Sequence, residues 1–266
     1  MRAKKSLGQN FLKSNLALQK IIEAGEIKKG DVILEIGPGK GALTKQLLAS
    51  RCQVLAVEKD SDLYEILKTK FQKEISSGQL NLILDDILDF DITKVVRQGL
   101  TTYKIIANIP YNITGAILKK FLTAEYQPTS MVIMVQHEVA KRIMAQGGKE
   151  SILSISVKAY GEGEMIMKVP ARYFSPSPKV DSAVIAIKNI SRKLFFHPGA
   201  SATPKEGNIN EEKFWNLVKT GFAHKRKKLS GNLRGLISLE KLKTLGLADK
   251  RAEDLSFKDW IALVKT

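Results

Sequence analysis

The sequence has few of the residues that build disulfides and metal sites. It contains one cysteine, Cys52, among 266 residues, so no internal disulfide can form, which fits a reducing cytosol. The three histidines are scattered along the chain. His137 begins an H-E-x-x pattern that reaches Lys141 instead of a second histidine, and His197 and His224 have no partners at ligand spacing. We therefore predict that the protein binds no metal.

Long apolar runs are also missing. No run approaches the roughly 20 residues that a membrane span needs. The basic N-terminus is not followed by the apolar segment of a secretion signal, because Ser6, Gly8, Gln9 and Asn10 interrupt it. We predict a cytoplasmic protein with no membrane partner.

Acidic residues are too few to balance the basic ones. The chain has 43 Lys and Arg against 27 Asp and Glu, a formal charge of +16. Such an excess attracts polyanions; charge alone leaves nucleic acid and an anionic membrane surface open, and we favour nucleic acid. The stretch HKRKKLSGNLR at 224–234 has six basic side chains in eleven residues. We interpret it as a phosphate-binding surface, although most charge runs are only solvated faces.

The sequence does contain a regular alternation of strand and helix patterns. In chain order, the predicted strands are 32–36, 53–57, 80–84, 104–107 and 131–135, and the predicted helices among them are 42–50, 61–75, 92–99 and 114–122. This order predicts an α/β fold: a parallel, doubly wound sheet with helices on both faces. A helical pattern at 15–24 precedes the sheet, and we expect the segment before it, SLGQNFL, to fold back over the molecule.

The second half of the chain changes character near residue 191. Before it we predict a helix at 136–145 and strands at 152–159 and 184–190, an antiparallel pair at one sheet edge. After it come a Pro- and Gly-containing linker and then helical patterns, the last opened by a Ser-x-x-Asp capping box at Ser256. The predicted division is a sheet domain at 1–190, a linker at 191–210 and a small all-helical basic domain at 211–266.

Polar residues and glycines stand where three predicted strands end. The GPGKG turn, with Gly37 and Gly39, lets a ligand approach the backbone at a helix N-terminus. Glu58 follows the second strand, at the position where an acid accepts hydrogen bonds from ribose hydroxyls. Asp86 follows the third strand, where it would accept a hydrogen bond from an adenine amine. Each signal is weak alone, because Asp85 and Asp86 also suit a helix cap. Together they predict an adenosine-bearing cofactor.

The fourth strand ends in Asn108, Ile109, Pro110 and Tyr111. Pro110 leaves the Ile109 carbonyl free to point away from the sheet, Asn108 adds a side-chain acceptor, and Tyr111 adds a flat ring. Two acceptors beside an aromatic ring suit the exocyclic amine of adenine, N6. The alternative is an ordinary strand followed by a proline turn. Phe174 is a candidate for a second stacking ring, with core packing as the equal alternative.

Two cofactors fit this edge. Gly37, Gly39 and Ala42 also satisfy the G-x-G-x-x-G/A dinucleotide pattern, so a nicotinamide-dependent oxidoreductase is an alternative. The Asn-Ile-Pro-Tyr end offers no evident acid or base for that chemistry. S-adenosyl-L-methionine would present a methyl group there and needs no pyrophosphate cradle, so we favour a methyltransferase.

Several stretches together resemble the rRNA adenine N6,N6-dimethyltransferase family, and most closely its bacterial small-subunit branch. The matching stretches are KKSLGQNFL at 4–12, EIGPGKGALT at 35–44, VEKD at 57–60, NIPYNI at 108–113, QHEVAKR at 136–142, FSPSPKVDSAV at 174–184 and FAHKRKKLSGNL at 222–233. They cover nearly the whole chain. The stretches KKSLGQNFL, NIPYNI and FSPSPKVDSAV in this order are very specific, whereas EIGPG occurs in many methyltransferases.

The resemblance implies a Rossmann-like class I methyltransferase domain that holds S-adenosyl-L-methionine. The implied cofactor residues are Gln9, Asn10, Leu12, Gly37, Gly39, Glu58, Lys59, Asp86, Ile87 and Asn108. The implied substrate is 16S rRNA within a small-subunit assembly intermediate, at two adjacent adenosines of its 3′-terminal stem-loop, each dimethylated at N6 by a monomeric enzyme. We expect phosphate contacts from Lys4, Lys5, Lys179, Lys225, Arg226, Lys227, Lys228 and Arg234.

Alternatives within and outside the family stay open. The related erythromycin-resistance methyltransferases share NIPY and modify 23S rRNA, but the FAHKRKKLSGNL stretch favours the small-subunit branch. Two departures from that branch are Ile109 in place of the usual Leu, and KESILSISV, which lacks the usual YGRLSV form. A catalytically silent assembly factor would use the same basic surface, but the intact NIPY and Glu58 argue against it.

Overall fold

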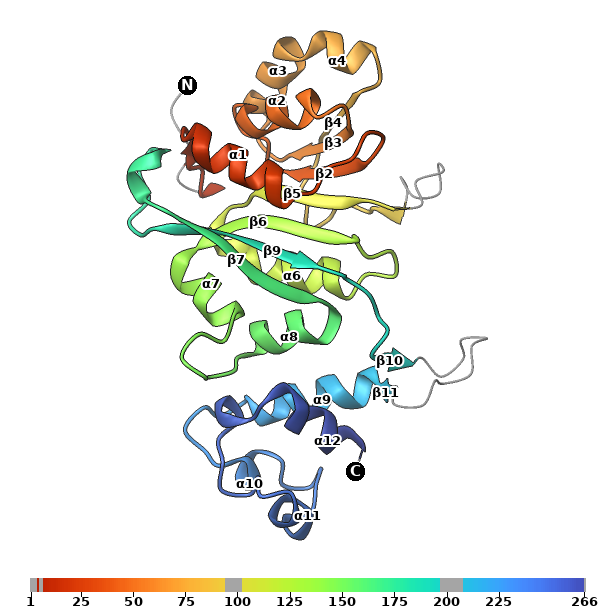
Figure 1. Ribbon diagram of the computed structural model, residues 1–266, viewed down its shortest axis with the longest axis vertical. Helices are drawn as coiled ribbons and strands as arrows, with labels where there is room; N and C mark the ends of the chain where they lie inside the picture. Colours follow the sequence, from red (N-terminus) through yellow and green to blue (C-terminus); the bar gives the residue numbers. More distant parts are fainter. Residues whose placement is uncertain (1–3, 5–6, 94–101, 197–207, 266) are drawn as a thin grey trace. The chain divides into compact units, whose positions relative to one another are not determined.

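A computed structural model describes residues 4, 7–93, 102–196 and 208–265 (Figure 1). The chain divides into two compact units, each made of two stretches. The first unit is Met1–Ala140 with Glu162–Ile190, and the second is Lys141–Gly161 with Ser191–Thr266. Residues 94–99 of the predicted helix and 197–207 of the predicted linker lie outside the described residues.

The first unit is built on a seven-stranded sheet in the order β4-β3-β2-β5-β6-β9-β7 (Figure 1). Its strands are β2 (Val32–Ile36), β3 (Gln53–Glu58), β4 (Leu80–Leu84), β5 (Lys104–Asn108), β6 (Ser130–Gln136), β7 (Glu162–Val169) and β9 (Ser182–Lys188). Strands β2 to β6 are parallel, and β9 runs antiparallel to both β6 and β7. The predicted α/β sheet is therefore confirmed.

Both faces of the sheet are buried, since neighbouring residues such as Ile33 and Leu34 point to opposite faces and both are inaccessible. The covering helices are α1 (Asn15–Ala24), α2 (Ala42–Ala49), α3 (Ser61–Lys70), α4 (Gln72–Ser76), α6 (Thr114–Leu122) and the start of α7 (His137–Ile143), with 3-10 turns η2 (Tyr111–Ile113) and η3 (Ala171–Tyr173). The single helix predicted at 61–75 is two helices, because Phe71 leaves helical geometry and packs its ring against Gly41.

The strand register brings the carboxyl ends of the parallel strands level. Ile36 pairs with Val57, and Glu58 pairs with Leu84. The segment before α1 folds back, as predicted: β1 (Phe11–Leu12) pairs antiparallel with β8 (Phe174–Ser175). One edge of the sheet thus gathers the strand ends and the described residues of the N-terminal arm, 4 and 7–13.

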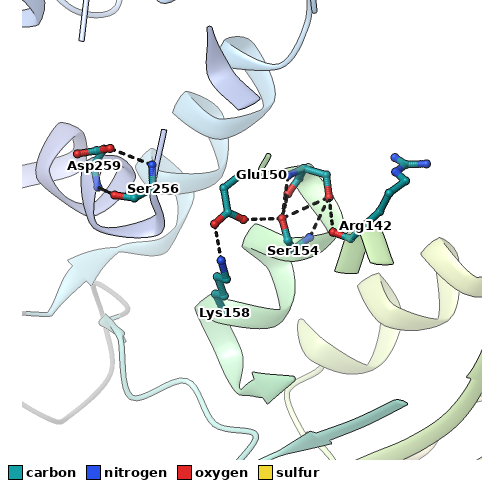
Figure 2. Close-up of polar contacts among 7 residues, drawn as sticks. Arg142, Glu150, Ser154, Lys158, Ser256 and Asp259 are labelled. Atoms are coloured by element: carbon teal, nitrogen blue, oxygen red, sulfur yellow. Dashed lines mark hydrogen bonds and ion pairs between the residues drawn. The ribbon is translucent and has the colours of Figure 1, made fainter. Parts of the chain in front are cut away.

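The segment predicted as a strand at 152–159 is instead the helix α8, Ile152–Tyr160. Its β-branched residues favoured a strand, but a capping box starts a helix: Ser151 N–H donates to Ser154 Oγ (2.7 Å), and Ser154 N–H donates to Ser151 Oγ (3.1 Å). Figure 2 also shows Glu150 accepting from the Ser154 hydroxyl and pairing with Lys158. The antiparallel partner of β9 at the sheet edge is β7, which the sequence prediction missed.

The second unit is helical. Besides α8 it contains α9 (Glu211–Gly221), α10 (Leu229–Asn232), α11 (Leu239–Thr244), η4 (Ala252–Asp254), α12 (Phe257–Lys265) and the short parallel pair β10 (Phe195–Phe196) and β11 (Ile209–Asn210). The predicted box at α12 is present, with Ser256 and Asp259 each accepting from the other's backbone N–H (Figure 2).

Aromatic packing joins α8 to the C-terminal helices. The rings of Tyr160 and Trp215 stack with centroids 6.1 Å apart, and the Trp215 indole N–H donates to the Tyr160 hydroxyl oxygen at 2.9 Å. That hydroxyl in turn donates to Glu211. These contacts explain why residues 141–161 group with the C-terminal stretch. Among the described helices, none has the length and apolar content to cross a bilayer.

Candidate active site

A cavity of about 500 Å³ lies at the carboxyl ends of β2, β3, β4 and β5, beneath the N-terminal arm. Its wall includes thirteen of the residues predicted for the site: Gln9, Asn10, Leu12, Gly37, Gly39, Glu58, Lys59, Asp86, Ile87, Asn108, Ile109, Pro110 and Tyr111. Residues far apart in the sequence therefore line one space at the sheet edge where ligands of open α/β folds bind.

The glycine turn after β2 forms one wall of the cavity. Gly37 and Gly39 have φ values of +63° and +60°, a left-handed conformation that favours glycine. A Cβ on Gly39 would lie 3.2 Å from carbons of the Phe11 ring, so the arm packs closely on the turn. The Gly39 N–H donates to Glu58 Oε2 at 3.0 Å. The turn is thus fixed to the end of β3.

Glu58 is only 5% exposed at the end of β3. Its Oε1 accepts from the Asp60 N–H at 2.9 Å, while Oε2 accepts from Gly39. Burial raises the pKa of Glu58, although these backbone donors act in the opposite direction. Each carboxylate oxygen keeps a lone pair for a further donor, as a ribose hydroxyl would supply.

A second buried acid, Glu35, was not among the sequence predictions. It lies on β2, is 1% exposed, and contributes to the cavity wall. Its Oε2 has no hydrogen-bond partner among the described residues. Burial raises its pKa to about 8, and the nearby Glu58 charge adds to this. The signal in the sequence was a lone acid inside the apolar strand VILEI.

Lys59 and Asp86 form an ion pair across the rim of the cavity. Lys59 Nζ lies 2.5 Å from Asp86 Oδ2, and Asp86 Oδ1 accepts from the Leu88 N–H at 2.9 Å. The lysine holds the pKa of Asp86 below its usual range. The carboxylate is therefore ionised and oriented, while Ile87 beside it is buried.

Asn108 ends β5 with its carboxamide oriented by the arm. Its Nδ2 donates to the Asn10 backbone carbonyl at 3.2 Å, and within the described residues no group donates to its Oδ1. Next along the chain, Ile109 is buried. The Tyr111 hydroxyl lies 2.5 Å from Ser182 Oγ on β9, which fixes the ring at the cavity wall. Burial raises the pKa of Tyr111.

The N-terminal arm is anchored by Asp60, two residues after Glu58. Gln9 Nε2 donates to Asp60 Oδ2 at 2.7 Å, and Lys4 Nζ lies 2.7 Å from Asp60 Oδ1. Gln9 Oε1 accepts from the Lys4 N–H at 2.8 Å, so both ends of the Gln9 amide are engaged within the protein. Sequence reasoning missed Asp60, although it lies in the same VEKD stretch as Glu58.

Phe174 differs from the other predicted residues. Its side chain is 2% exposed and packs in the core cluster that contains Leu12, with which it pairs across β1 and β8. In this arrangement it is a core residue, and Ser175 beside it faces the cavity instead. A stacking role for Phe174 stays a prediction.

The predicted phosphate-binding residues have different surroundings. Lys4 pairs with Asp60 and Asp62, and Lys228 with Asp249 at 2.7 Å. The remaining described ones are exposed: Lys179, Lys225, Arg226, Lys227 and Arg234. Lys5 lies outside the described residues.

The basic loop, His224–Lys228, is held from beneath by Asn232. The Asn232 Nδ2 donates to the Gly221 carbonyl at 2.6 Å and to the His224 carbonyl at 3.1 Å. The loop therefore presents its cations from a fixed backbone. In the part of the chain that the structure describes, no three His, Cys, Asp or Glu side chains gather as a metal site.

Comparisons with known proteins show which family this chain is similar to. The family model of ribosomal RNA adenine dimethylase matches residues 1–266. Ribosomal RNA small subunit methyltransferase A of Dehalococcoides mccartyi (strain CBDB1) is 39% identical over 267 residues, which cover 98% of this chain and 87% of the relative.

Two solved structures share the fold. A dimethyladenosine transferase from Plasmodium falciparum superposes with a TM-score of 0.75 at 26% identity, over 95% of each chain. The 23S rRNA methyltransferase ErmE superposes with a TM-score of 0.73 at 23% identity, over 96% of this chain and 98% of the ErmE chain.

Proposed function

This chain belongs to the ribosomal RNA adenine dimethylase family, and we propose that it methylates N6 of two adjacent adenosines in the 3′-terminal stem-loop of 16S rRNA. The observation that carries the proposal is one shared cavity. Asn108 and Tyr111 line the same space as Glu58 and Asp86, so an adenine amine and an adenosine-bearing donor can meet there.

The residues present fit S-adenosyl-L-methionine, the methyl donor of this class of enzyme. The cavity is large enough for a nucleoside with an amino-acid arm. Glu58 and the ionised Asp86 are acceptors for ribose hydroxyls and an adenine amine. The unpartnered Glu35 Oε2 is a buried acceptor that a cationic ligand would satisfy. Bound there, the donor supplies an electrophilic methyl carbon on a sulfonium.

The chain's own contribution is to orient the attacking amine. Asn108 Oδ1 and the Ile109 carbonyl would accept the two N6 hydrogens, which favours a pyramidal nitrogen whose lone pair faces the methyl carbon. Methyl transfer would form the new N–C bond at N6 as the S–C bond of the donor breaks, and the surplus proton of N6 would leave to water. Tyr111, with its ring fixed by Ser182, would stack on an adenine presented out of its loop.

The basic loop supports rRNA as the polyanion. Lys225, Arg226 and Lys227 are exposed on a loop whose backbone Asn232 fixes. We favour the small subunit over 23S rRNA, because the relative at 39% identity is named a small-subunit enzyme, whereas the 23S enzyme at 23% supports the fold alone. We expect a monomer that acts on an assembly intermediate in the cytoplasm, where the substrate forms.

The test is Asn108→Ala, assayed by methyl transfer to unmethylated small-subunit particles. Losing one of two preorganised acceptors should lower kcat by about 100-fold or more, while the dissociation constant of S-adenosylhomocysteine changes less than about threefold. Asn81→Ala, which removes an exposed amide on β4, is the matched control. Unimpaired turnover in Asn108→Ala would remove the proposed role. Mass spectrometry of small-subunit rRNA from cells lacking the protein would identify the two adenosines.

A further inference from the structure

Asp60 makes more contacts than a helix cap requires. Its Oδ1 accepts from the Asp62 N–H at 3.0 Å, which caps α3. Its other oxygen, Oδ2, accepts from the Gln9 side-chain amide, and no other group among the described residues donates to it. The Asp60 side chain is 0% exposed, and a buried charge is retained only where its partners compensate for lost water. Those partners, Lys4 and Gln9, both belong to the N-terminal arm.

One residue separates this anchor from the catalytic amide. Gln9 is followed by Asn10, whose backbone carbonyl accepts from Asn108 Nδ2 at 3.2 Å. The Asn10 side chain donates to the Gly8 carbonyl at 3.0 Å, and Gly8 adopts φ +63°, so the arm turns tightly here. Displacing Gln9 from Asp60 would therefore shift the carbonyl that orients Asn108.

We propose that Asp60 is a positioning residue that latches the N-terminal arm through Gln9 and, through the Asn10 carbonyl, keeps Asn108 Oδ1 directed at the substrate amine. This inference rests on the proposed function, since it takes Asn108 as an N6 acceptor. The latch also fixes one wall of the cavity, because residues 7–13 of the arm line it.

Exchanging the donor and the acceptor between Gln9 and Asp60 distinguishes the contact of Asp60 with the arm from its role in capping α3. Asp60→Asn keeps an oxygen for the Asp62 N–H but turns an N–H towards the Gln9 Nε2 donor. Gln9→Glu keeps an oxygen for the Lys4 N–H but turns a second carboxylate towards Asp60 Oδ2. The double variant Gln9→Glu/Asp60→Asn restores a donor–acceptor pair with the direction reversed. Asp62→Asn, which touches Lys4 but not Gln9, is the control.

Three quantities are measured: amide hydrogen exchange of residues 7–13 without ligand, the KM for S-adenosylmethionine, and kcat on small-subunit particles. Each single variant should raise arm exchange and the KM about tenfold, the loss of one charge-assisted hydrogen bond. The kcat should fall about threefold, because the displaced Asn10 carbonyl orients Asn108 less well, although bound cofactor favours the latched arm. In the double variant, arm exchange and the KM should return most of the way to their wild-type values. In Asp62→Asn, both quantities should stay within about twofold of wild type.

The outcomes separate this proposal from the proposed function. Wild-type protein that methylates rRNA, together with single variants whose arm exchange and KM are unchanged, would overturn the latch alone. A double variant as impaired as the singles would also overturn it, because general damage at the end of β3 is not repaired by exchanging the donor and the acceptor. Arm exchange requires no activity, so it reports on the latch even if methyl transfer fails.

Discussion

The buried acid Glu35 should make the stability of this protein fall as the pH rises from about 4.5 to about 8. Its pKa is about 8 in the folded protein, against 4.5 as its ordinary value. The folded state therefore keeps a proton that the unfolded chain loses. The contribution to stability is complete below about pH 4.5 and is lost as the pH rises to about 8.

The magnitude follows from the size of this shift. Each pH unit in the window costs about 1.4 kcal/mol of unfolding free energy, so the full window amounts to about 5 kcal/mol and the step from pH 6 to pH 8 to about 2–3 kcal/mol. In a unit of this size that step lowers the melting temperature by roughly 5–10 °C. Glu35→Gln removes the titrating group and with it this part of the pH dependence.

The assay is thermal unfolding of wild type, Glu35→Gln and the exposed control Glu65→Gln, between pH 5 and pH 9 without cofactor. As the pH rises, the melting temperature of Glu35→Gln should increase relative to that of wild type. The melting temperature of Glu65→Gln should change with pH as wild type does. Parallel curves for Glu35→Gln and wild type would refute the reasoning. Added S-adenosylmethionine should reduce the difference in melting temperature between Glu35→Gln and wild type, because a cation beside Glu35 stabilises its charged form.

Two further predictions concern the RNA and the stacking ring. Replacing Lys225, Arg226 and Lys227 with Gln should reduce the magnitude of the slope of log K against log salt for rRNA binding by about two to three, as measured by filter binding. An unchanged slope would place the phosphate contacts elsewhere. Ser182→Ala should lower kcat about fivefold in the wild-type background and have no effect in Tyr111→Phe, since Ser182 would act through the Tyr111 hydroxyl; equal losses in both backgrounds would contradict this.

The sheet edge was predictable because the information is local. The Gly37 turn, Glu58, Asp86 and Asn108 each follow an apolar run directly, and parallel strands bring such positions to one edge whatever their distance in sequence. The folded-back arm was predictable for a related reason, since SLGQNFL is too apolar for a free tail.

Side-chain partners were not predictable in the same way. Gln9 lines the cavity, but the sequence did not show that Asp60 and Lys4 engage its amide, nor that Phe174 packs in the core. Which partner a side chain finds depends on contacts between distant segments. Neither local pattern nor spacing determines those contacts. Glu35 was overlooked because a lone acid in an apolar strand signals a buried carboxylate but does not locate the cavity that it lines.

The wrong strand at 152–159 has a similar cause. Ile152, Ile155 and Val157 favour a strand by local propensity, but Ser151 caps a helix whose Tyr160 finds Trp215 more than fifty residues later. Long-range packing outweighed local preference there, and the strand at the sheet edge formed from residues 162–169 instead.

The chain passes between its two units three times, at residues 140–141, 161–162 and 190–191. No single cut can therefore separate them, and a fragment ending at residue 190 would leave the Tyr160 ring without its Trp215 neighbour. Anyone grafting the helical unit onto another family member must transplant both pieces together. A single splice would divide the aromatic packing between donor and recipient.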